Sequence, residues 1–413
     1  MTLTAGPALT TDRSLRAATR AVYAAFIWSG FAMASWATRI PQIRDELRLG
    51  PSQLGLVLVA IAVGSIISLV LSGQIVARLG SRATVAAMAV LLAVGLTVVA
   101  AGYHLGVPPV VLGLFAFGFA NGAWDVAMNV QGALVERRLG RAIMPRFHAG
   151  YSVGTVAGAL LGTAMVALKV PVTAHLIAVA VLAGASTFVM VRTFLPDDAP
   201  ASAEGGSPEK KGGLLEFWTE PRTLLVGVFV LAFAFTEGAG IDWIAVAVID
   251  GYDTPAAVGT LAFTVFLTAM TAGRWFGPAL LDRFGRVPVV RALAVIALAG
   301  LALFIFGPNT PTAYAGALLW GTGASLGFPV AMSAASDDPA RAAGRVSVVA
   351  SIGYCAFLGG PPLIGVLGDH MSVLRALIAI PVLLTVAFLL AGAIRPLPES
   401  PETTETSETP ARV

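Results

Sequence analysis

Long apolar runs, repeated along the whole chain, are the feature that most constrains its fold. Stretches of about 20 residues rich in Ala, Val, Leu, Ile and Phe alternate with short polar turns. A helix of that length crosses the hydrocarbon core of a bilayer, where only helices and closed barrels satisfy every backbone hydrogen bond. With 57% hydrophobic and 12% charged residues, the chain has more apolar surface than a water-soluble fold can bury. We therefore predict an all-α integral membrane protein.

Twelve of these runs are long enough to span a membrane, and a polar segment separates the first six from the last six. The segment 195–221 is rich in Pro, Ala, Gly, Ser and Glu, which is the composition of a flexible linker. It predicts two six-helix bundles, 17–194 and 222–394, with cytosolic tails at 1–16 and 395–413, the second of them disordered. The predicted spans are residues 17–38, 52–77, 83–102, 109–133, 146–168, 172–194, 222–248, 255–280, 288–307, 312–335, 344–367 and 373–394.

Lysines and arginines are distributed unequally between the two sides of the predicted bundles. With both termini on the inner side, most of the 26 cationic residues fall in inner loops or tails. Because cytosolic loops carry an excess of Lys and Arg, this asymmetry predicts cytosolic termini in a bacterial inner membrane. It also explains the net charge of +3 without nucleic-acid binding. The cations predicted on the outer side are Arg39, Arg44, Arg48, Lys169 and Arg375.

Two loops of similar sequence follow the second and the eighth predicted spans. Residues 73–82 read GQIVARLGSR and residues 282–286 read DRFGR. Both resemble the Gly-x-x-x-Asp-Arg-x-Gly-x-Arg loop of the major facilitator superfamily, although Ala77 and Pro278 stand at the Asp and Gly positions of that pattern. The resemblance implies two six-helix bundles that rock around a central cavity. It also implies a conformational latch made of Gly73, Arg78, Gly80, Arg82, Asp282, Arg283, Gly285 and Arg286.

Three segments within the spans narrow the resemblance. Residues 118–129, GFANGAWDVAMN, are similar to the acid-x-x-x-Asn segment of the fucose:proton symporter branch, in which the acid serves in proton coupling. Residues 235–243, FTEGAGIDW, and 353–362, GYCAFLGGPP, look like an uncharacterised bacterial subgroup related to that branch. The resemblance implies a solute transporter and leaves the solute open.

Ionisable residues inside spans are the candidates for proton coupling. A carboxylate there costs about 2.5–3.5 kcal/mol on insertion scales, and protonation removes that cost. Asp125 in the fourth span and Glu237 near the middle of the seventh are therefore predicted to bind protons, with His148 at the start of the fifth as a relay. A structural pair or hydrogen bond is the alternative for the two acids, and a capping or interfacial role is the alternative for His148. Asp242 is expected to have a structural role.

Polar and aromatic residues near these acids are the candidates for solute binding. Asn121 and Asn129 lie four residues on either side of Asp125, so the three share one helix face. Aromatic side chains in the spans can stack on a sugar or an aromatic solute, although packing in the bundle is the alternative. Arg274 is expected to extend to the inner membrane face. The predicted solute-binding residues are Asn121, Asn129, Trp28, Trp124, Trp320 and Tyr354.

The sequence thus predicts a secondary active transporter that moves a sugar-like or other small organic solute by proton-coupled alternating access. Proton-driven efflux of amphipathic or toxic compounds is one alternative, and a non-transporting membrane sensor is another. The sequence carries no phosphate-binding Gly-x-x-x-x-Gly-Lys loop and no His-Glu-x-x-His motif, and its single cysteine is Cys355. We therefore expect no enzymatic activity, cofactor or metal, and a monomer whose partners are the solute, protons and the lipid bilayer.

Overall fold

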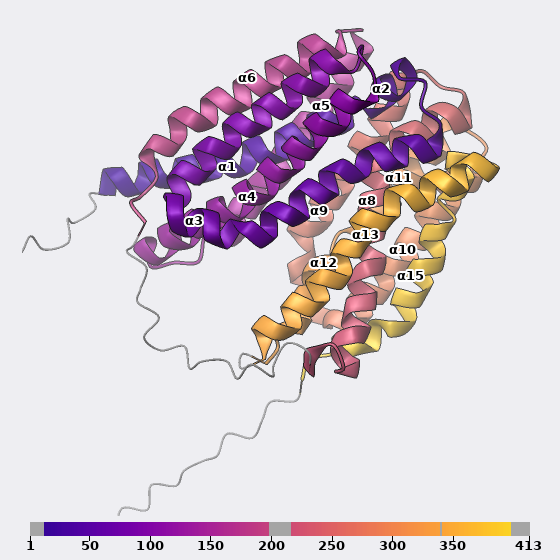
Figure 1. Cartoon of the computed structure of the whole chain (residues 1–413). Coiled ribbons are helices and arrows are strands. Elements are labelled where there is room, and N and C mark those ends of the chain that lie inside the picture. The colour runs from indigo at the N-terminus through magenta and orange to yellow at the C-terminus, as the bar shows by residue number, and fades with distance from the viewer. Residues whose placement is uncertain (1–11, 198–215, 339–340, 398–413) are drawn as a thin grey trace, which may run out of the picture.

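The computed structural model describes residues 12–197, 216–338 and 341–397, and within these residues it is helical without β-strands (Figure 1). Ten helices, as counted in these residues, are long and apolar enough to span a membrane. One of them, α3, contains two spans because Gly80 interrupts it with φ 78° and ψ 160°. The 26-residue helix α1 adds a further span. The predicted all-α fold with twelve spans is confirmed. Most of the predicted linker and disordered tail lies outside the described residues.

The first bundle contains the spans that precede the linker. The short helix α2 joins the first two spans on one side of the bundle, and α3 bends at Gly80 on the other. The elements are α1 (Asp12–Ala37), α2 (Ile40–Glu46), α3 (Pro51–Gly102), α4 (Val107–Leu139), α5 (Met144–Ala167), α6 (Val172–Met190) and the 3₁₀ turn η1 (Val191–Thr193).

The second bundle repeats this arrangement, but two of its spans are interrupted. The tenth span consists of α11 and α12, and the last consists of α14, α15 and η2. The elements are α8 (Pro221–Tyr252), α9 (Ala256–Phe284), α10 (Arg286–Phe306), α11 (Thr310–Ala324), α12 (Gly327–Ala335), α13 (Ala342–Met371), α14 (Val373–Ala376), α15 (Ala379–Leu390) and η2 (Ala391–Ile394).

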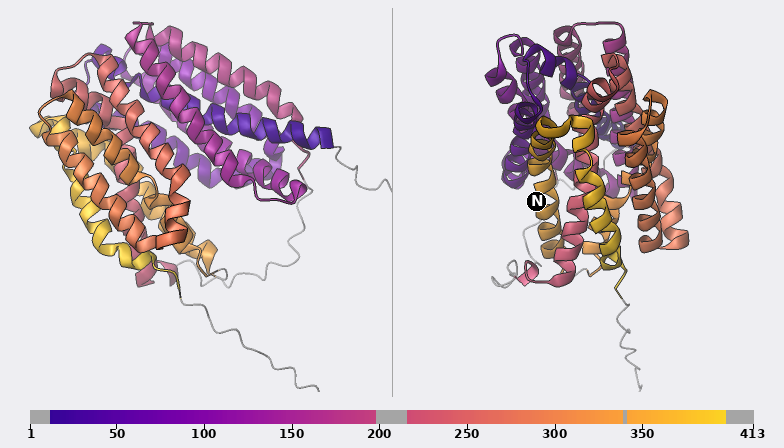
Figure 2. Two further views of the ribbon diagram at one scale, coloured as in Figure 1. Left: turned by 180° about the vertical axis from the view of Figure 1, so that it is seen from behind. Right: turned by 90° about the vertical axis from the view of Figure 1, so that its right-hand side faces the viewer.

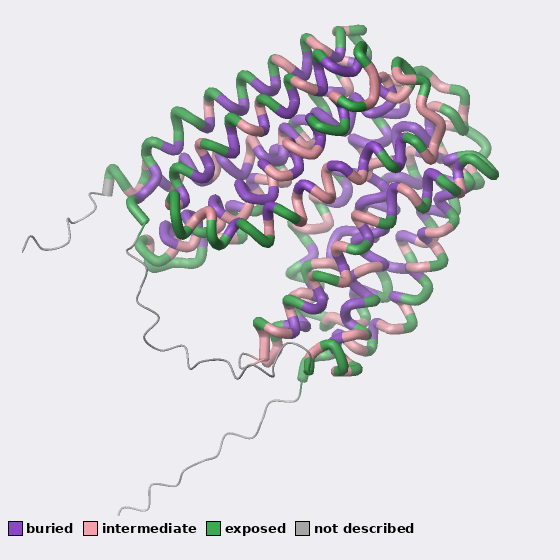
Figure 3. The backbone as a smooth tube through the Cα atoms, in the orientation of Figure 1, coloured by how far each residue is buried: buried purple, intermediate pink, exposed green. Residues whose placement is uncertain are grey.

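The two bundles meet at one end and diverge towards the other (Figures 1 and 2). Both ends of the described chain lie on the diverging side, which we refer to as the inner side (Figure 1). Buried residues fill the interior of each bundle, and exposed residues lie along its outer surface (Figure 3). Large apolar side chains such as Val70, Leu112 and Val181 are among the exposed ones. Outward apolar residues are expected where a helix contacts lipid.

The outer ends of the bundles are held together by close helix contacts. A Cβ atom on Gly55 of α3 would lie 2.5 Å from the carbonyl oxygen of Pro361 in α13, so only glycine permits this approach. Between α5 and α9, the hydroxyls of Thr163 and Thr264 are 2.9 Å apart. Two polar contacts bridge the outer rim: Arg44 of α2 pairs with Asp250 of α8, and Ser52 pairs with Asp369. The outer side is therefore closed.

Candidate functional site

A cavity of about 960 Å³ lies between the bundles and opens to the inner side. This volume falls within the range that small-molecule sites occupy. Its wall comes from α1, α4 and α5 of the first bundle and from α8, α9, α12 and α13 of the second. The polar and aromatic residues of the wall include Phe26, Asp125, His148, Tyr151, Ser152, Glu237, Thr271, Arg274, Trp275, Phe328, Tyr354 and Phe357.

Asp125 contributes a carboxylate to this wall from within the span α4. The side-chain amide of Asn129 donates to the Asp125 carboxylate at 3.3 Å and to its backbone oxygen at 2.8 Å. Among the residues that the structure describes, no cationic side chain lies within ion-pair distance of Asp125. Gly118 and Gly122 place α4 directly against α3, because a Cβ on Gly118 would lie 2.8 Å from the carbonyl carbon of Ile61 and one on Gly122 would lie 2.9 Å from the backbone oxygen of Ser65. Asp125 is thus an unpaired acid that a solute or a proton can reach.

Glu237 forms an ion pair across the cavity wall of the second bundle. The Arg274 Nη2 atom donates to Glu237 at 2.7 Å, and the side chains are 30% and 18% exposed. The Arg274 Nε atom donates to the backbone oxygen of Ser325 at 3.2 Å. The expectation that Arg274 extends to the inner membrane face is therefore wrong. The pair presents a donor group and an acceptor group to the cavity side by side.

His148 and Tyr354 also line the cavity, as part of its aromatic wall. The His148 ring meets the Phe26 ring edge-on with centroids 5.0 Å apart, and Tyr354 lies beside Phe357 with centroids 6.4 Å apart. The structure therefore brings Asp125, Glu237, His148 and Tyr354 around one space. Asp242 is not among the residues that line it.

The other residues predicted to bind solute lie outside the cavity lining in this conformation. Trp124 and Trp320 are fully buried inside their own bundles, where the Trp320 indole nitrogen donates to the Thr236 oxygen at 3.2 Å. Their predicted stacking on a solute is thus replaced by packing. Trp28 is half-buried beside Phe31. Two asparagines have partners in the protein: Asn121 accepts from Ser29 at 2.9 Å, and Asn129 binds Asp125.

Comparison with protein families shows where the chain belongs. A family model described as Major Facilitator Superfamily matches residues 22–359. The chain belongs to the Major Facilitator Superfamily. The resemblance carried by the two Gly-Arg loops is confirmed, and the protein is a multi-pass membrane transporter. Transporters of this superfamily carry small-molecule substrates.

Curated relatives and solved structures agree with this superfamily assignment. An uncharacterised transporter of Yersinia pestis is 31% identical over 88% of this chain and 92% of its own length. Transporter y4wD of Sinorhizobium fredii, also uncharacterised, is 30% identical over 85% and 91%. The membrane protein MosC of Rhizobium meliloti is 27% identical over 86% and 84%.

Two solved superfamily transporters share the fold at low sequence identity. The nucleoside transporter NupG aligns with a TM-score of 0.71 at 15% identity, covering 92% of this chain and 98% of NupG. The E. coli fucose:proton symporter FucP, in its outward conformation, aligns with a TM-score of 0.60 at 16% identity over 91% and 98%. At such identities the likeness shows the fold alone.

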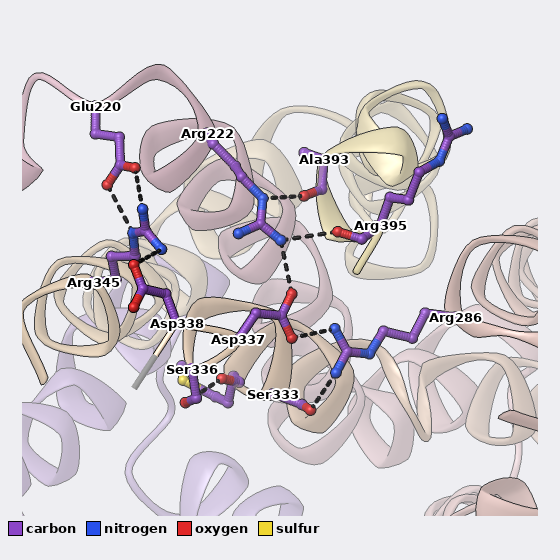
Figure 4. Close-up of polar contacts among 11 residues, drawn as sticks. Glu220, Arg222, Arg286, Ser333, Ser336, Asp337, Asp338, Arg345, Ala393 and Arg395 are labelled. Carbon is purple, nitrogen blue, oxygen red and sulfur yellow. Dashed lines mark hydrogen bonds and ion pairs between the residues drawn. The ribbon is translucent and has the colours of Figure 1, made fainter. Parts of the chain in front are cut away.

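The second of the two loops predicted to form a latch is held by an ion-pair network (Figure 4). Gly285 has φ 79°, a conformation that favours glycine, and it turns the chain from α9 into α10. The next residue, Arg286, pairs with Asp337 at 2.7 Å and donates to the Ser333 hydroxyl at 2.9 Å. Asp337 also accepts from Arg222 at 2.9 Å. The carboxylate at the end of the tenth span thus joins the latch loop to the start of α8.

The first predicted latch loop has the same glycine turn but different hydrogen-bond partners. Gly80 has φ 78°, and Ser81, which follows it, donates through its backbone nitrogen to Asp197 at 2.7 Å. The side chain of Gln131 donates to the Ser81 hydroxyl at 2.8 Å. The remaining predicted latch residues are mostly exposed: Gly73, Arg78 and Arg82 on the first loop, and Asp282 at the cavity mouth. The guanidinium carbon of Arg283 lies 5.0 Å from the centroid of the Phe284 ring.

Several residues of the cavity wall were not predicted from the sequence. These residues include Arg274, for which the sequence predicts a position at the membrane face, and Tyr151 and Ser152, which are not among the predicted site residues. The spacing of His148, Tyr151 and Ser152 is three and four residues, so one helix face carries all three. That helical spacing from His148 is the sequence signal that indicates the two hydroxyl groups.

Proposed function

We propose that this transporter moves a small, uncharged, polyhydroxylated solute across a bacterial inner membrane, together with protons, by alternating access. The observation that carries the proposal is the cavity wall, where the unpaired carboxylate of Asp125 faces the same space as the Glu237–Arg274 pair. We place the inner side in the cytosol, in agreement with the excess of arginines there, and propose that the monomer is the working unit.

Asp125 supports the proton-coupled part of the proposal. A charged carboxylate within a span is costly, and closing the inner side would remove Asp125 from the water of the cavity. Protonation neutralises the side chain and so favours the conformation that buries it. His148, which lies in the wall near the cavity mouth, is suited to pass protons between water and this acid.

The Glu237–Arg274 pair supports an uncharged solute with hydroxyl groups. A hydroxyl both donates and accepts hydrogen bonds, so it can bind the acceptor oxygens of Glu237 and the donor nitrogens of Arg274 together. The cavity lining contains three acids, Asp125, Glu237 and Asp282, and two arginines, Arg274 and Arg286. Because Arg286 is already paired with Asp337, a polyanion would meet net repulsion. The aromatic rings of Trp275, Phe328 and Phe357 offer apolar faces for the carbon skeleton of the solute.

The same aromatic rings favour the second candidate function, which is efflux of amphipathic compounds. Apolar rings line much of the cavity together with Phe26 and Tyr354. An amphipathic solute would depend mainly on these rings, whereas a polyol would depend mainly on the Glu237–Arg274 pair. The two functions are therefore separated by comparing Phe328→Ala with Glu237→Gln on solute binding.

The experiment that tests the proposal uses purified protein in liposomes with an imposed pH gradient. Labelled sugars, polyols and amphiphiles are compared, with Asp125→Asn as the variant and Asp242→Asn as a control acid outside the cavity lining. We expect Asp125→Asn to abolish gradient-driven accumulation while solute exchange without a gradient persists, and Asp242→Asn to retain both. Unchanged accumulation in Asp125→Asn would contradict proton coupling at this residue. A protein that binds solutes but never moves them would indicate a sensor.

A further inference from the structure

The tenth span is interrupted where it meets the cavity. Helix α11 ends at Ala324, and α12 begins at Gly327. Pro329 lies in the first turn of α12 and has no backbone N–H, so the carbonyl of Ser325 four residues earlier lacks its helical donor. A backbone carbonyl at membrane depth must find another partner, because lipid offers none.

Arg274 supplies that partner from the neighbouring helix α9. Its Nε atom donates to the Ser325 oxygen at 3.2 Å, while its Nη2 atom pairs with Glu237 at 2.7 Å. Two glycines of α9 bring the arginine this close to the break. A Cβ on Gly273 would lie 2.6 Å from the Cβ of Ser325, and one on Gly277 would lie 2.7 Å from a methyl carbon of Leu326. One guanidinium therefore joins the cavity acid to the broken helix.

Helix α12 connects this break to the inner latch. Phe328, Pro329 and Val330, near the start of α12, line the cavity. Ser333 in its last turn and Asp337 just beyond its end bind Arg286 of the second latch loop (Figure 4). Ser333 and Arg286 also line the inner part of the cavity. The nine-residue helix α12 therefore runs along the cavity wall from the break at its start to the latch contact at its end.

We infer that Arg274 is a positioning residue that fixes α12 through its hydrogen bond to the Ser325 carbonyl. A solute that binds Glu237 or Arg274 would therefore weaken the contacts that the end of α12 makes with Arg286 of the inner latch loop. This inference rests on the alternating-access part of the proposed function. It differs from a solute-binding role alone, because it assigns to Arg274 an effect on α12 that is present without any solute.

The test follows the position of α12 with spin labels in the full chain, in lipid nanodiscs and without solute. The background variant is Cys355→Ser, which removes the native cysteine. The distance between labels at Ala142→Cys and Ser336→Cys, the α12 pair, reports on the end of α12 relative to the first bundle. The distance between labels at Ala142→Cys and Pro288→Cys, the α10 pair, reports on α10 relative to the first bundle. All three positions are exposed, so labels disturb little packing.

Arg274→Met is expected to change the ratio of distance populations for the α12 pair by about tenfold, because hydrogen bonds from a charged donor are among the stronger ones. The α10 pair is expected to stay unchanged.

Adding Pro329→Ala restores a backbone N–H that can bind the Ser325 carbonyl, so the double variant should return to the distances of the parent protein. Glu237→Gln, which keeps the volume of the side chain, should shift the α12 pair in the same direction and serves as the variant if Arg274→Met does not fold.

Three results would overturn the inference: no shift of the α12 pair in either variant, equal shifts of both label pairs, or a shift that Pro329→Ala does not reverse. Each of these is read without transport. Failure of the proposed function would instead appear as absence of solute movement in liposomes while the α12 response persists.

Discussion

Asp337 lies at the centre of the inner ion-pair network, so we expect its neutralisation to destabilise the second bundle. Its carboxylate, only 10% exposed, accepts from Arg222 at 2.9 Å and from Arg286 at 2.7 Å, and both arginines are 23% exposed. Removing one partner of a buried ion pair costs about 3–5 kcal/mol. Because these groups keep some contact with solvent, we expect about 2–3 kcal/mol for Asp337→Asn.

The assay is thermal unfolding of the purified protein at neutral pH. Since about 1 kcal/mol lowers the melting temperature of a domain of this size by about 2–4 °C, Asp337→Asn should lower Tm by about 5–10 °C. The matched control is Asp282→Asn, which neutralises an exposed acid on the same inner side with no ion-pair partner among the described residues. Equal melting temperatures for the two variants would refute the reasoning.

Three further predictions concern other contacts. The pKa of Glu220 is lowered by its hydrogen bonds to Arg345, so this contact stabilises the fold above the pKa of an unfolded glutamate and is lost as pH falls through the folded pKa. In Glu220→Gln, the free energy of unfolding should therefore fall less steeply as pH is lowered, as measured by thermal unfolding across acidic pH. Gly285→Ala should cost about 1–3 kcal/mol in thermal unfolding because φ is 79°, whereas Gly392→Ala, with open space around it, should cost little. Gly55→Val should prevent close contact of α3 with α13. In a Cys355→Ser background, a maleimide supplied from the outer side should then label a cysteine introduced in the cavity by Ser152→Cys faster.

The fold was predictable because apolarity alone determines it. Each predicted span corresponds to one described helix, to half of α3, or, for the tenth and last spans, to two or three consecutive short helices. The two glycines of the predicted latch loops marked the turns at Gly80 and Gly285. A continuous apolar run must be helical in a bilayer, whatever its neighbours are. The interruption between α11 and α12 was not predicted, although Pro329 was a visible sign of it.

The site was only partly predictable because helix orientation depends on packing between spans. Asp125 and Glu237 were identified from the cost of charge within a span, which requires no knowledge of neighbours. The partner of Glu237 lies 37 residues away on another helix, so no local pattern indicated Arg274. Trp124 and Trp320 illustrate the opposite error, because an aromatic residue in mid-span packs in the bundle unless its face meets the cavity.

The most direct measurement of proton coupling at Asp125 is the pH change that solute movement produces in lightly buffered liposomes. On addition of a transported solute outside the liposomes, we predict that the unmodified protein carries protons inward with the solute, so that the pH of the external medium rises. In Asp125→Asn we predict solute exchange without any such pH change. Two results would contradict the proposed function. One is solute uptake into liposomes with the unmodified protein but without a pH change, and the other is the same pH change with Asp125→Asn.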